Sequence, residues 1–261
     1  MAKPRVLCLR APGTNCDRDT AFAFEQAGAV AEVHHIQAVL REPNKLAQFQ
    51  ILCVPGGFSY GDDLSAGRIL GHQMQVHLGD VMQGFKDRGA LILGICNGFQ
   101  VLTKTGLLLP IDPQQGPAAT LTLNRSGRYE DRWVHLHVTP GKSVFLQGIT
   151  QMYLPVAHAE GRFTARNAST LLNLERGGQL VMQYVPTPGG DPRGEVAYPA
   201  NPNGAQLNVA GICDETGRVF GLMPHPERHI DVTHHPRWTR GEGKPGGDGL
   251  KLFQNAVAYF Q

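Results

Sequence analysis

The chain has 261 residues, which is long enough for one large α/β domain with a buried core. Hydrophobic residues make up 41% and charged residues 18%, a balance typical of a globular protein rather than of a disordered one. The formal net charge is +2, and the sequence has no basic block or basic–aromatic stripe, so no nucleic acid and no membrane surface is expected as a partner.

The five cysteines are odd in number and irregularly spaced, which does not fit a disulfide framework. The first residues lack the long apolar run of a secretory signal, and no segment approaches the length of a membrane span. We therefore expect a cytoplasmic protein, in a compartment that keeps cysteines as free thiols.

Short apolar runs alternate with helix-like segments through the N-terminal part of the chain. The predicted strands are Arg5–Leu9, Val30–Ile36, Ile51–Val54 and Ala90–Ile95, and the predicted helices are Asp17–Ala27, Ala66–Arg88 and Asn97–Lys104. Strands that alternate with helices in this way predict a parallel sheet covered by helices on both faces.

The middle of the chain has a different pattern. Between Leu121 and Val185 the apolar runs shorten and alternate with polar residues, most clearly over Trp133–Val138. This alternation is typical of half-exposed antiparallel strands. Two later apolar runs, Leu207–Cys213 and Val219–Met223, are separated by a turn signal and predict a hairpin.

The C-terminal segment completes the predicted fold. Pro236–Gly249 is rich in glycine, proline and charge and predicts an exposed loop, whereas apolar residues from Leu250 to Phe260 recur three or four apart, as on one face of a closing helix. We find no internal repeat and no clean linker. The sequence therefore predicts one α/β domain over residues 1–261, with an open, mostly parallel sheet flanked by helices and an added antiparallel β region.

The segment around Cys96 carries the first chemical signal. Gly94 and Gly98 flank the cysteine in a G-x-C-x-G arrangement, with a predicted strand before it and a predicted helix after it. This is the context of a nucleophile elbow, in which the glycines avoid clashes and the nucleophile adopts a strained backbone conformation. The start of the helix favours a thiolate, and the Asn97 N–H is in position to donate to an oxyanion.

Cys16 is an alternative nucleophile, because it also opens a predicted helix. It lacks flanking elbow glycines, however, and the neighbouring carboxylate of Asp17 opposes thiolate formation. The other cysteines, Cys8, Cys53 and Cys213, lie within apolar strand-like runs and fit structural positions.

A thiolate nucleophile needs a base, and the base needs a partner that orients it. The segment Met223–Arg228 directly follows an apolar strand, and its two prolines restrict the backbone. Residues two apart in an extended chain point the same way, so His225 and Glu227 are predicted to face one site. Two alternatives stay open: a surface turn, or a metal site with His229, although Pro226 disfavours the helix that such a metal spacing needs.

The loop Val54–Asp62 follows another buried strand and contains Gly56 and Gly57. Loops at the carboxyl ends of parallel strands line the ligand crevice, and glycines there let backbone N–H groups approach an oxyanion. The loop has neither a G-x-G-x-x-G pattern nor a P-loop lysine, so no nucleotide site is predicted in this chain.

Together these segments resemble the class I, triad-type glutamine amidotransferases, whose fold is flavodoxin-like. The G-x-C-x-G-x-Q pattern of Gly94–Gln100 and the P-H-P-E pattern of Pro224–Glu227 carry this resemblance. Pro155–Gly161 matches as well, and Pro12–Asp17 and Pro55–Asp62 resemble more closely the glutaminase subunits of phosphoribosylformylglycinamidine synthase, an enzyme of purine biosynthesis. One departure is that Pro236–Gly249 is longer than in compact members of the family.

The resemblance implies roles for particular residues. Cys96 would be the nucleophile, His225 the base and Glu227 its orienter, while Gly57 and Asn97 would donate backbone N–H groups to the oxyanion. The residues implied to bind the substrate L-glutamine are Phe58, Gln100, Ala157, His158 and Glu160. No metal ligand is implied.

The resemblance also implies partners. Ammonia from glutamine would pass to a large synthetase subunit, often accompanied by a small accessory subunit, and ATP and Mg²⁺ would be used by that partner while this chain holds no cofactor. The product would be formylglycinamidine ribonucleotide, made from formylglycinamide ribonucleotide. The residues alone leave alternatives open: a glutaminase for another acceptor, a cysteine peptidase-like hydrolase on the same elbow, or a non-catalytic binding subunit.

Overall fold

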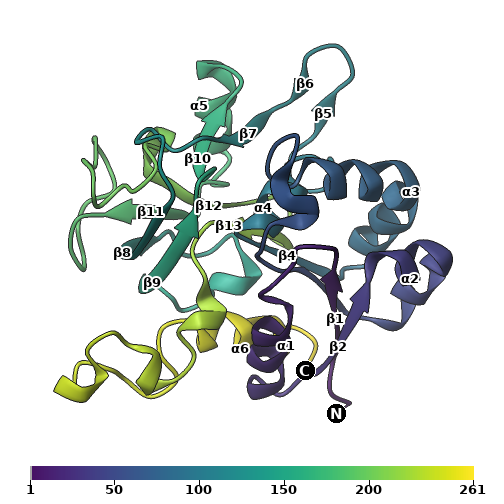
Figure 1. Cartoon of the computed structure of the whole chain (residues 1–261), viewed down its shortest axis with the longest axis horizontal. Coiled ribbons are helices and arrows are strands. Elements are labelled where there is room, and N and C mark those ends of the chain that lie inside the picture. The colour runs from purple at the N-terminus through teal and green to yellow at the C-terminus, as the bar shows by residue number, and fades with distance from the viewer. Residues whose placement is uncertain (1) are drawn as a thin grey trace.

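A nine-stranded sheet forms the centre of the protein in the computed structural model, which describes residues 2–261 (Figure 1). The strand order is β2-β1-β3-β4-β13-β12-β11-β8-β9. The bounds are β1 Arg5–Arg10, β2 Val30–His35, β3 Ile51–Val54, β4 Leu91–Ile95, β8 Glu130–Val138, β9 Gln151–His158, β11 Met182–Val185, β12 Val209–Cys213 and β13 Val219–Leu222. Neighbours from β2 to β13 are parallel, and neighbours from β13 to β9 are antiparallel, as predicted.

Two small antiparallel sheets extend this β region. One joins β7 (Ala119–Thr122) to β10 (Arg162–Ala165), and the other joins β5 (Ile111–Asp112) to β6 (Gly116–Pro117). The predicted hairpin is confirmed as the antiparallel pair of β12 and β13.

The helices include two that the sequence analysis did not predict, α2 and α5. The α-helices are α1 Asp17–Gln26, α2 Ile36–Arg41, α3 Arg68–Asp87, α4 Asn97–Leu102, α5 Ala168–Arg176 and α6 Leu250–Ala258. Short 3-10 helices are Pro43–Gln48, Ser59–Asp62, Val144–Leu146, Gln206–Asn208, Pro226–Arg228, Val232–His234 and Trp238–Arg240. The predicted strand through Ile36 ends one residue earlier, because the His35 side chain accepts a hydrogen bond from the Gln37 N–H and caps α2.

The helices pack on both faces of the parallel half of the sheet. The chain moves along the sheet in one direction through α1 and in the opposite direction through α3, so right-handed crossovers place these helices on opposite faces. Figure 1 shows α1 beside α6, apart from α2 and α3. Phe24 of α1 and Phe253 of α6 meet edge to face, with ring centroids 4.9 Å apart.

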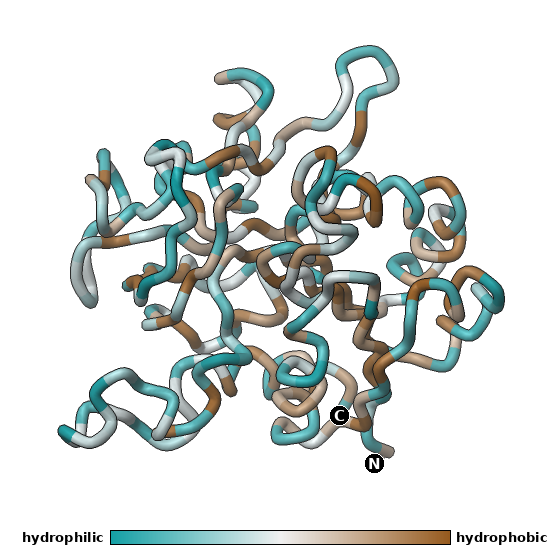
Figure 2. The backbone as a smooth tube through the Cα atoms, in the orientation of Figure 1, coloured by the Kyte–Doolittle hydropathy of each residue, from teal (hydrophilic) through white to brown (hydrophobic). Residues whose placement is uncertain are grey.

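Hydrophobic residues concentrate along the central strands, whereas the outer loops are more hydrophilic (Figure 2). Every residue of β3, β4, β12 and β13 is buried. The predicted loop Pro236–Gly249 is largely exposed and contains the short helix Trp238–Arg240. No helix within residues 2–261 is both long and apolar enough to cross a membrane.

The direction of travel reverses between the adjacent strands β1 and β3, which makes this point the switch of an open α/β sheet. The segments that follow β1, β3, β4 and β13 all leave from the carboxyl ends of parallel strands. They bring Cys16, Gly57, Cys96 and His225 to the same edge of the sheet.

Candidate active site

Cys96 occupies the predicted elbow between β4 and α4. Its backbone has φ 51° and ψ −107°, a strained conformation for a residue with a side chain. A Cβ on Gly94 would lie 2.6 Å from the Gly98 carbonyl oxygen, and a Cβ on Gly98 would lie 1.7 Å from the Val54 carbonyl oxygen. Both glycines are therefore required by close backbone contacts, as the sequence pattern predicted.

The Cys96 thiol is directed across the site from β4 towards β9. Its sulfur lies 3.6 Å from the carbonyl oxygen of Ala157, at the end of β9. The Cys96 N–H donates to the Leu222 carbonyl at 2.7 Å, which ties the elbow to the end of β13. The segment with His225 begins just beyond β13, so the position of β13 fixes both the elbow and the histidine.

His225 and Glu227 form a buried pair. The Nδ1 atom of His225 lies 2.6 Å from Oε1 of Glu227, and the two side chains are 2% and 0% exposed. The sequence analysis expected an extended segment here, but Pro226–Arg228 forms a 3-10 turn. The two side chains meet because of this turn rather than because of strand alternation.

The charges around His225 favour its protonated form. Burial lowers the pKa of the imidazole, but the negative charge of Glu227 and the sulfurs of Cys96 and Cys16 outweigh burial and raise the pKa well above its ordinary value. The Nε2 atom of His225 is buried and has no hydrogen-bond partner within residues 2–261. This nitrogen is free to exchange a proton with a reacting group.

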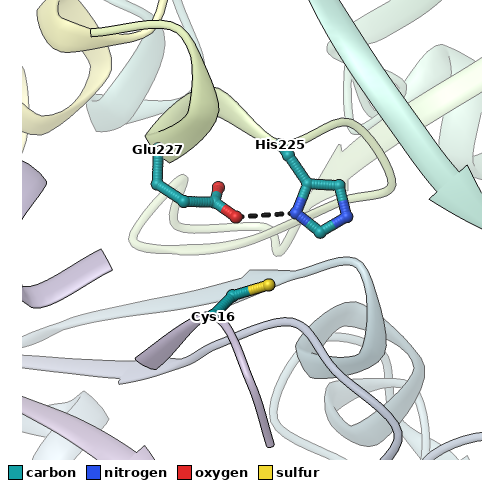
Figure 3. A group of neighbouring side chains, drawn as sticks. All are labelled: Cys16, His225 and Glu227. Atoms are coloured by element: carbon teal, nitrogen blue, oxygen red, sulfur yellow. Dashed lines mark hydrogen bonds and ion pairs between the residues drawn. The ribbon is translucent and has the colours of Figure 1, made fainter. Parts of the chain in front are cut away.

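Cys16 also reaches the site. Ligand atoms of Cys16, His225 and Glu227 all lie within 4.8 Å of one another, and Figure 3 shows the sulfur directed at the histidine–glutamate pair. His229, which the metal alternative invoked, does not belong to this group. Its Nδ1 atom lies 2.7 Å from the Tyr153 carbonyl oxygen instead.

The group fits proton sharing better than metal binding. Two ligands on a tetrahedral zinc ion are separated by about 3.3 Å, since each bond is about 2.0–2.1 Å long. The 2.6 Å between His225 Nδ1 and Glu227 Oε1 is the length of a hydrogen bond. The guanidinium of Arg228 also donates to the Cys16 sulfur at 3.1 Å, and this positive charge opposes a cation there.

The loop after β3 is held against the loop after β1. Gly57 has φ 142°, and a Cβ there would lie 2.7 Å from the Gly13 carbonyl oxygen. The Phe58 N–H donates to the same carbonyl at 2.9 Å. The Phe58 N–H is thus occupied within the protein, so only the side chain of Phe58 is available to contact a substrate. Its ring stacks on that of Tyr129, with ring centroids 6.3 Å apart.

A buried network of hydrogen bonds surrounds the start of α4. The Asn97 side chain accepts from the Ser59 N–H at 3.1 Å and donates to Asp62 at 3.1 Å and to Gln100 at 2.9 Å. Gln100 in turn donates to the Glu160 carbonyl oxygen at 2.6 Å. Burial raises the pKa of Asp62. The network joins the loop after β3, the elbow and the turn after β9 into one unit.

His158 lies in the same region but supports the turn after β9. Its Nδ1 atom is 3.2 Å from Asn124 Oδ1, and the Asn124 side chain also binds the His158 carbonyl oxygen at 2.8 Å and the Gly161 N–H at 3.0 Å. Burial, followed by the charge of His225, lowers the pKa of His158 to about 3. His158 is therefore neutral at the pH values at which enzymes usually work.

The sequence analysis did not assign site roles to Asp62, Asn124, Tyr129 or Arg228. Burial and then the charge of Cys96 raise the pKa of Tyr129, whose ring stacks on Phe58 in the loop after β3. Asp62 lies inside a segment that carried the resemblance and Arg228 directly follows another, so their position was a usable signal. Asn124 and Tyr129 lie between β7 and β8, inside the region of alternating residues, and no local pattern marks them.

Comparisons with known proteins show the family of the chain. Residues 3–260 match the family described as "CobB/CobQ-like glutamine amidotransferase domain". The chain is 48% identical to "Phosphoribosylformylglycinamidine synthase subunit PurQ" of Dehalococcoides mccartyi, over 99% of this chain and 98% of that one. It is 41% identical to the protein of the same name from Methanococcus maripaludis, over 98% and 97% of the two chains.

Solved structures agree as well. A chain of the "Structure of PurLQS from Thermotoga maritima" superposes with a TM-score of 0.74 at 30% identity, over 100% of both chains. A putative GMP synthase subunit from Thermoplasma acidophilum, with a TM-score of 0.57 at 13% identity, shares the fold. The chain therefore belongs to the CobB/CobQ-like glutamine amidotransferases.

Proposed function

We propose that this glutamine amidotransferase uses Cys96 as nucleophile, His225 as general acid and base, and Glu227 as the group that orients His225. The observation that carries the proposal is the buried hydrogen bond between His225 and Glu227 beside a cysteine held at φ 51°. A strained nucleophile, an imidazole with one free nitrogen and a carboxylate on the other nitrogen are the parts that nucleophilic acyl transfer needs.

The reaction begins with attack of the Cys96 thiolate on the side-chain amide carbon of glutamine. The carbonyl oxygen becomes an oxyanion, which accepts hydrogen bonds from the backbone N–H groups of Gly57 and Asn97. Imidazolium at His225 gives its Nε2 proton to the amide nitrogen, and ammonia leaves a glutamyl thioester on Cys96. Water then loses a proton to His225 as it attacks the thioester, and glutamate and the thiolate are released.

The glutamine substrate is bound by the residues around the start of α4 and the turn after β9. The Gln100 side chain supports this pocket by a hydrogen bond to the Glu160 carbonyl oxygen, and the Asn97 side chain by one to the Asp62 carboxylate. The Glu160 carboxylate, which accepts from the Ala66 N–H at 3.2 Å, offers a negative charge for the α-amino group of glutamine. Ala157 contributes its carbonyl oxygen, Phe58 covers the opening with its exposed ring, and His158 holds the turn.

The relatives' names support a specific assignment, the glutaminase subunit of phosphoribosylformylglycinamidine synthase. In this role the chain supplies ammonia to a large synthetase subunit, with a small accessory subunit in the complex, as the name PurLQS of the similar structure suggests. The synthetase uses ATP and Mg²⁺ to convert formylglycinamide ribonucleotide to formylglycinamidine ribonucleotide. The chain works in the cytoplasm, and residues 1–261 act as a single amidotransferase domain.

The test measures glutamine hydrolysis by wild type and Cys96→Ala, each with and without the synthetase subunits. We expect Cys96→Ala to lose essentially all activity and Cys213→Ala, a buried cysteine at the end of β12, to keep it. Retained glutaminase activity in Cys96→Ala would overturn the triad. Transfer of ammonia to another acceptor in the assembled complex, or peptide cleavage without glutamine hydrolysis, would overturn the assignment to purine synthesis.

A further inference from the structure

The segment Pro12–Asp17 carries part of the family resemblance, yet the proposed reaction uses none of its side chains. Its cysteine nevertheless lies in the catalytic cluster. Cys16 is 1% exposed, and its sulfur lies within 4.8 Å of ligand atoms of both His225 and Glu227. Figure 3 shows it on the opposite side of the cluster from the chain that carries that pair.

The Cys16 thiol has a defined set of partners. Its sulfur accepts a hydrogen bond from the Arg228 guanidinium at 3.1 Å, and the thiol donates to Asn15 Oδ1 at 3.2 Å. The Cys16 N–H donates to the Gly56 carbonyl at 3.2 Å. One accepted and one donated bond satisfy a neutral thiol, and the backbone bond holds it against the loop after β3.

The space around the imidazole is closed on this side. A Cβ on Gly56 would lie 2.8 Å from His225 Cε1 and 3.2 Å from the Cys16 sulfur. Gly56 therefore packs against both the ring and the sulfur, with no room for a methyl group at this position, and the sulfur lies within 4.8 Å of a ring nitrogen. The imidazole cannot swing towards the loop after β1 without displacing the sulfur.

Arg228 links Cys16 to the proton chemistry. Its Nε atom lies 4.0 Å from Glu227 Oε1, the same oxygen that binds His225. Arg228 and His225 thus compete for one carboxylate oxygen. The Arg228 guanidinium donates a hydrogen bond from Nη2 to the Cys16 sulfur instead of to Glu227. The Glu227 carboxylate therefore pairs with the imidazole of His225.

We propose that Cys16 is a positioning residue for His225: it packs against the imidazole and holds Arg228 away from Glu227. This inference rests on the proposed role of His225 and adds a requirement for Cys16. The titratable and charged groups around the imidazole are Cys16, Cys96, Tyr129, His158, Glu227 and Arg228. Of these, Cys16 and Arg228 are the pair that sets the position of the ring and the direction of the Glu227 charge.

The test compares Cys16→Ala, Cys16→Ser, Arg228→Met and the double variant Cys16→Ala/Arg228→Met in the assembled complex, with Cys213→Ala as the matched cysteine control. For Cys16→Ala we expect kcat for glutamine hydrolysis to fall about tenfold with KM within about twofold of wild type. The alkaline limb of the pH profile should move to lower pH, because Arg228, no longer held by the sulfur, can pair with Glu227 and weaken its attraction for the imidazolium. Cys16→Ser, which keeps a donor and an acceptor, should recover most of kcat.

The double variant separates positioning from folding. Removal of Arg228 takes away the competing cation, so the alkaline limb of Cys16→Ala/Arg228→Met should return towards the wild-type pH. A limb that stays at the wild-type pH in Cys16→Ala, or a loss of kcat that only follows the fraction of unfolded protein, would overturn the inference. If Cys16→Ala does not fold, Cys16→Gly replaces it, because this change also removes the sulfur that holds Arg228. Its alkaline limb must then lie at lower pH than that of wild type, and a limb at the wild-type pH would overturn the inference.

Labelling with diazo-oxo-norleucine distinguishes this inference from the proposed triad. Mass spectrometry should find the adduct on Cys96 in wild type and in Cys16→Ala, formed about tenfold more slowly in the variant. An adduct on Cys16 would make Cys16 the nucleophile and overturn both proposals. Loss of labelling in Cys96→Ala together with an unchanged rate in Cys16→Ala would uphold the triad and reject the positioning role alone.

Discussion

Glu227 Oε1 lies 2.6 Å from His225 Nδ1, in a site where both side chains are almost completely buried. A buried carboxylate–imidazole pair fixes the tautomer and leaves Nε2, which has no hydrogen-bond partner within residues 2–261, available to a reacting group. It also stabilises the imidazolium, and the pKa of His225 is accordingly raised even though burial alone lowers it. The pair therefore sets both the direction and the strength of the proton transfer.

Glu227→Gln should remove the charge while keeping the shape of the side chain. We expect kcat for glutamine hydrolysis to fall by about a hundredfold, within the range of general acid–base contributions, with little change in KM. The alkaline limb of the pH profile should move to lower pH, since the imidazolium loses its counter-charge. The matched control is Glu215→Gln, in an exposed turn. Activity within threefold of wild type would show that Glu227 does not support His225.

Gly98→Ala should disrupt the elbow. The added methyl group would lie 1.7 Å from the Val54 carbonyl oxygen, so β3 or α4 must shift. We expect a loss of about 1–3 kcal/mol in the free energy of unfolding, measured in urea, together with slower labelling of Cys96. Gly79→Ala in α3 is the control, because a Cβ there meets nothing within 4 Å. It should stabilise the helix by about 0.4–1 kcal/mol, and equal destabilisation of both variants would contradict the elbow argument.

Local patterns were enough to predict much of the fold. The buried runs of β1, β3 and β4 stand out in the sequence because each is a short, mainly apolar segment next to a helix-like or glycine-containing one. Helix α5 was missed, because it lies where alternating residues predicted strands. Its start depends on the Asn167 side chain, which accepts from the Thr170 N–H at 2.8 Å. A cap of this kind is a weak signal when the surrounding pattern favours strands.

In the candidate site, too, local patterns predicted some residues and missed those that depend on tertiary contacts. Cys96 and His225 could be proposed because glycines and prolines beside them are local signals. The contact between Cys16 and Arg228 joins residues 212 positions apart, and no periodicity predicts it. Asn124 is similar, since its hydrogen bonds reach 34 and 37 positions along the chain to His158 and Gly161. Contacts that depend on tertiary packing appear only once the strands are assembled.

His158 should make the protein sensitive to acid. Its pKa is lowered from 6.5 to about 3, mainly by burial. Between these two pH values the imidazole is protonated in the unfolded chain and neutral in the folded chain. Stability from this site is complete above about pH 6.5 and is lost as the pH falls towards 3. At pH 5 the loss is about 2 kcal/mol. Urea unfolding of His158→Gln should therefore depend less on pH between 5 and 7 than wild type, whereas exposed His77→Gln should match wild type. Parallel pH curves for His158→Gln and wild type would contradict the burial argument.

Gln100→Glu should damage substrate binding more than chemistry. Gln100 donates to the Glu160 carbonyl oxygen at 2.6 Å and accepts from Asn97 at 2.9 Å, so its amide needs both a donor and an acceptor. A carboxylate keeps the acceptor but would face the carbonyl oxygen without a hydrogen, which costs about 1–3 kcal/mol in a buried position. The turn that carries Glu160 should move, and KM for glutamine should rise about tenfold or more while kcat changes less. Gln75→Glu, on the exposed side of α3, provides the control. An unchanged KM in Gln100→Glu would mean that the turn after β9 does not hold glutamine.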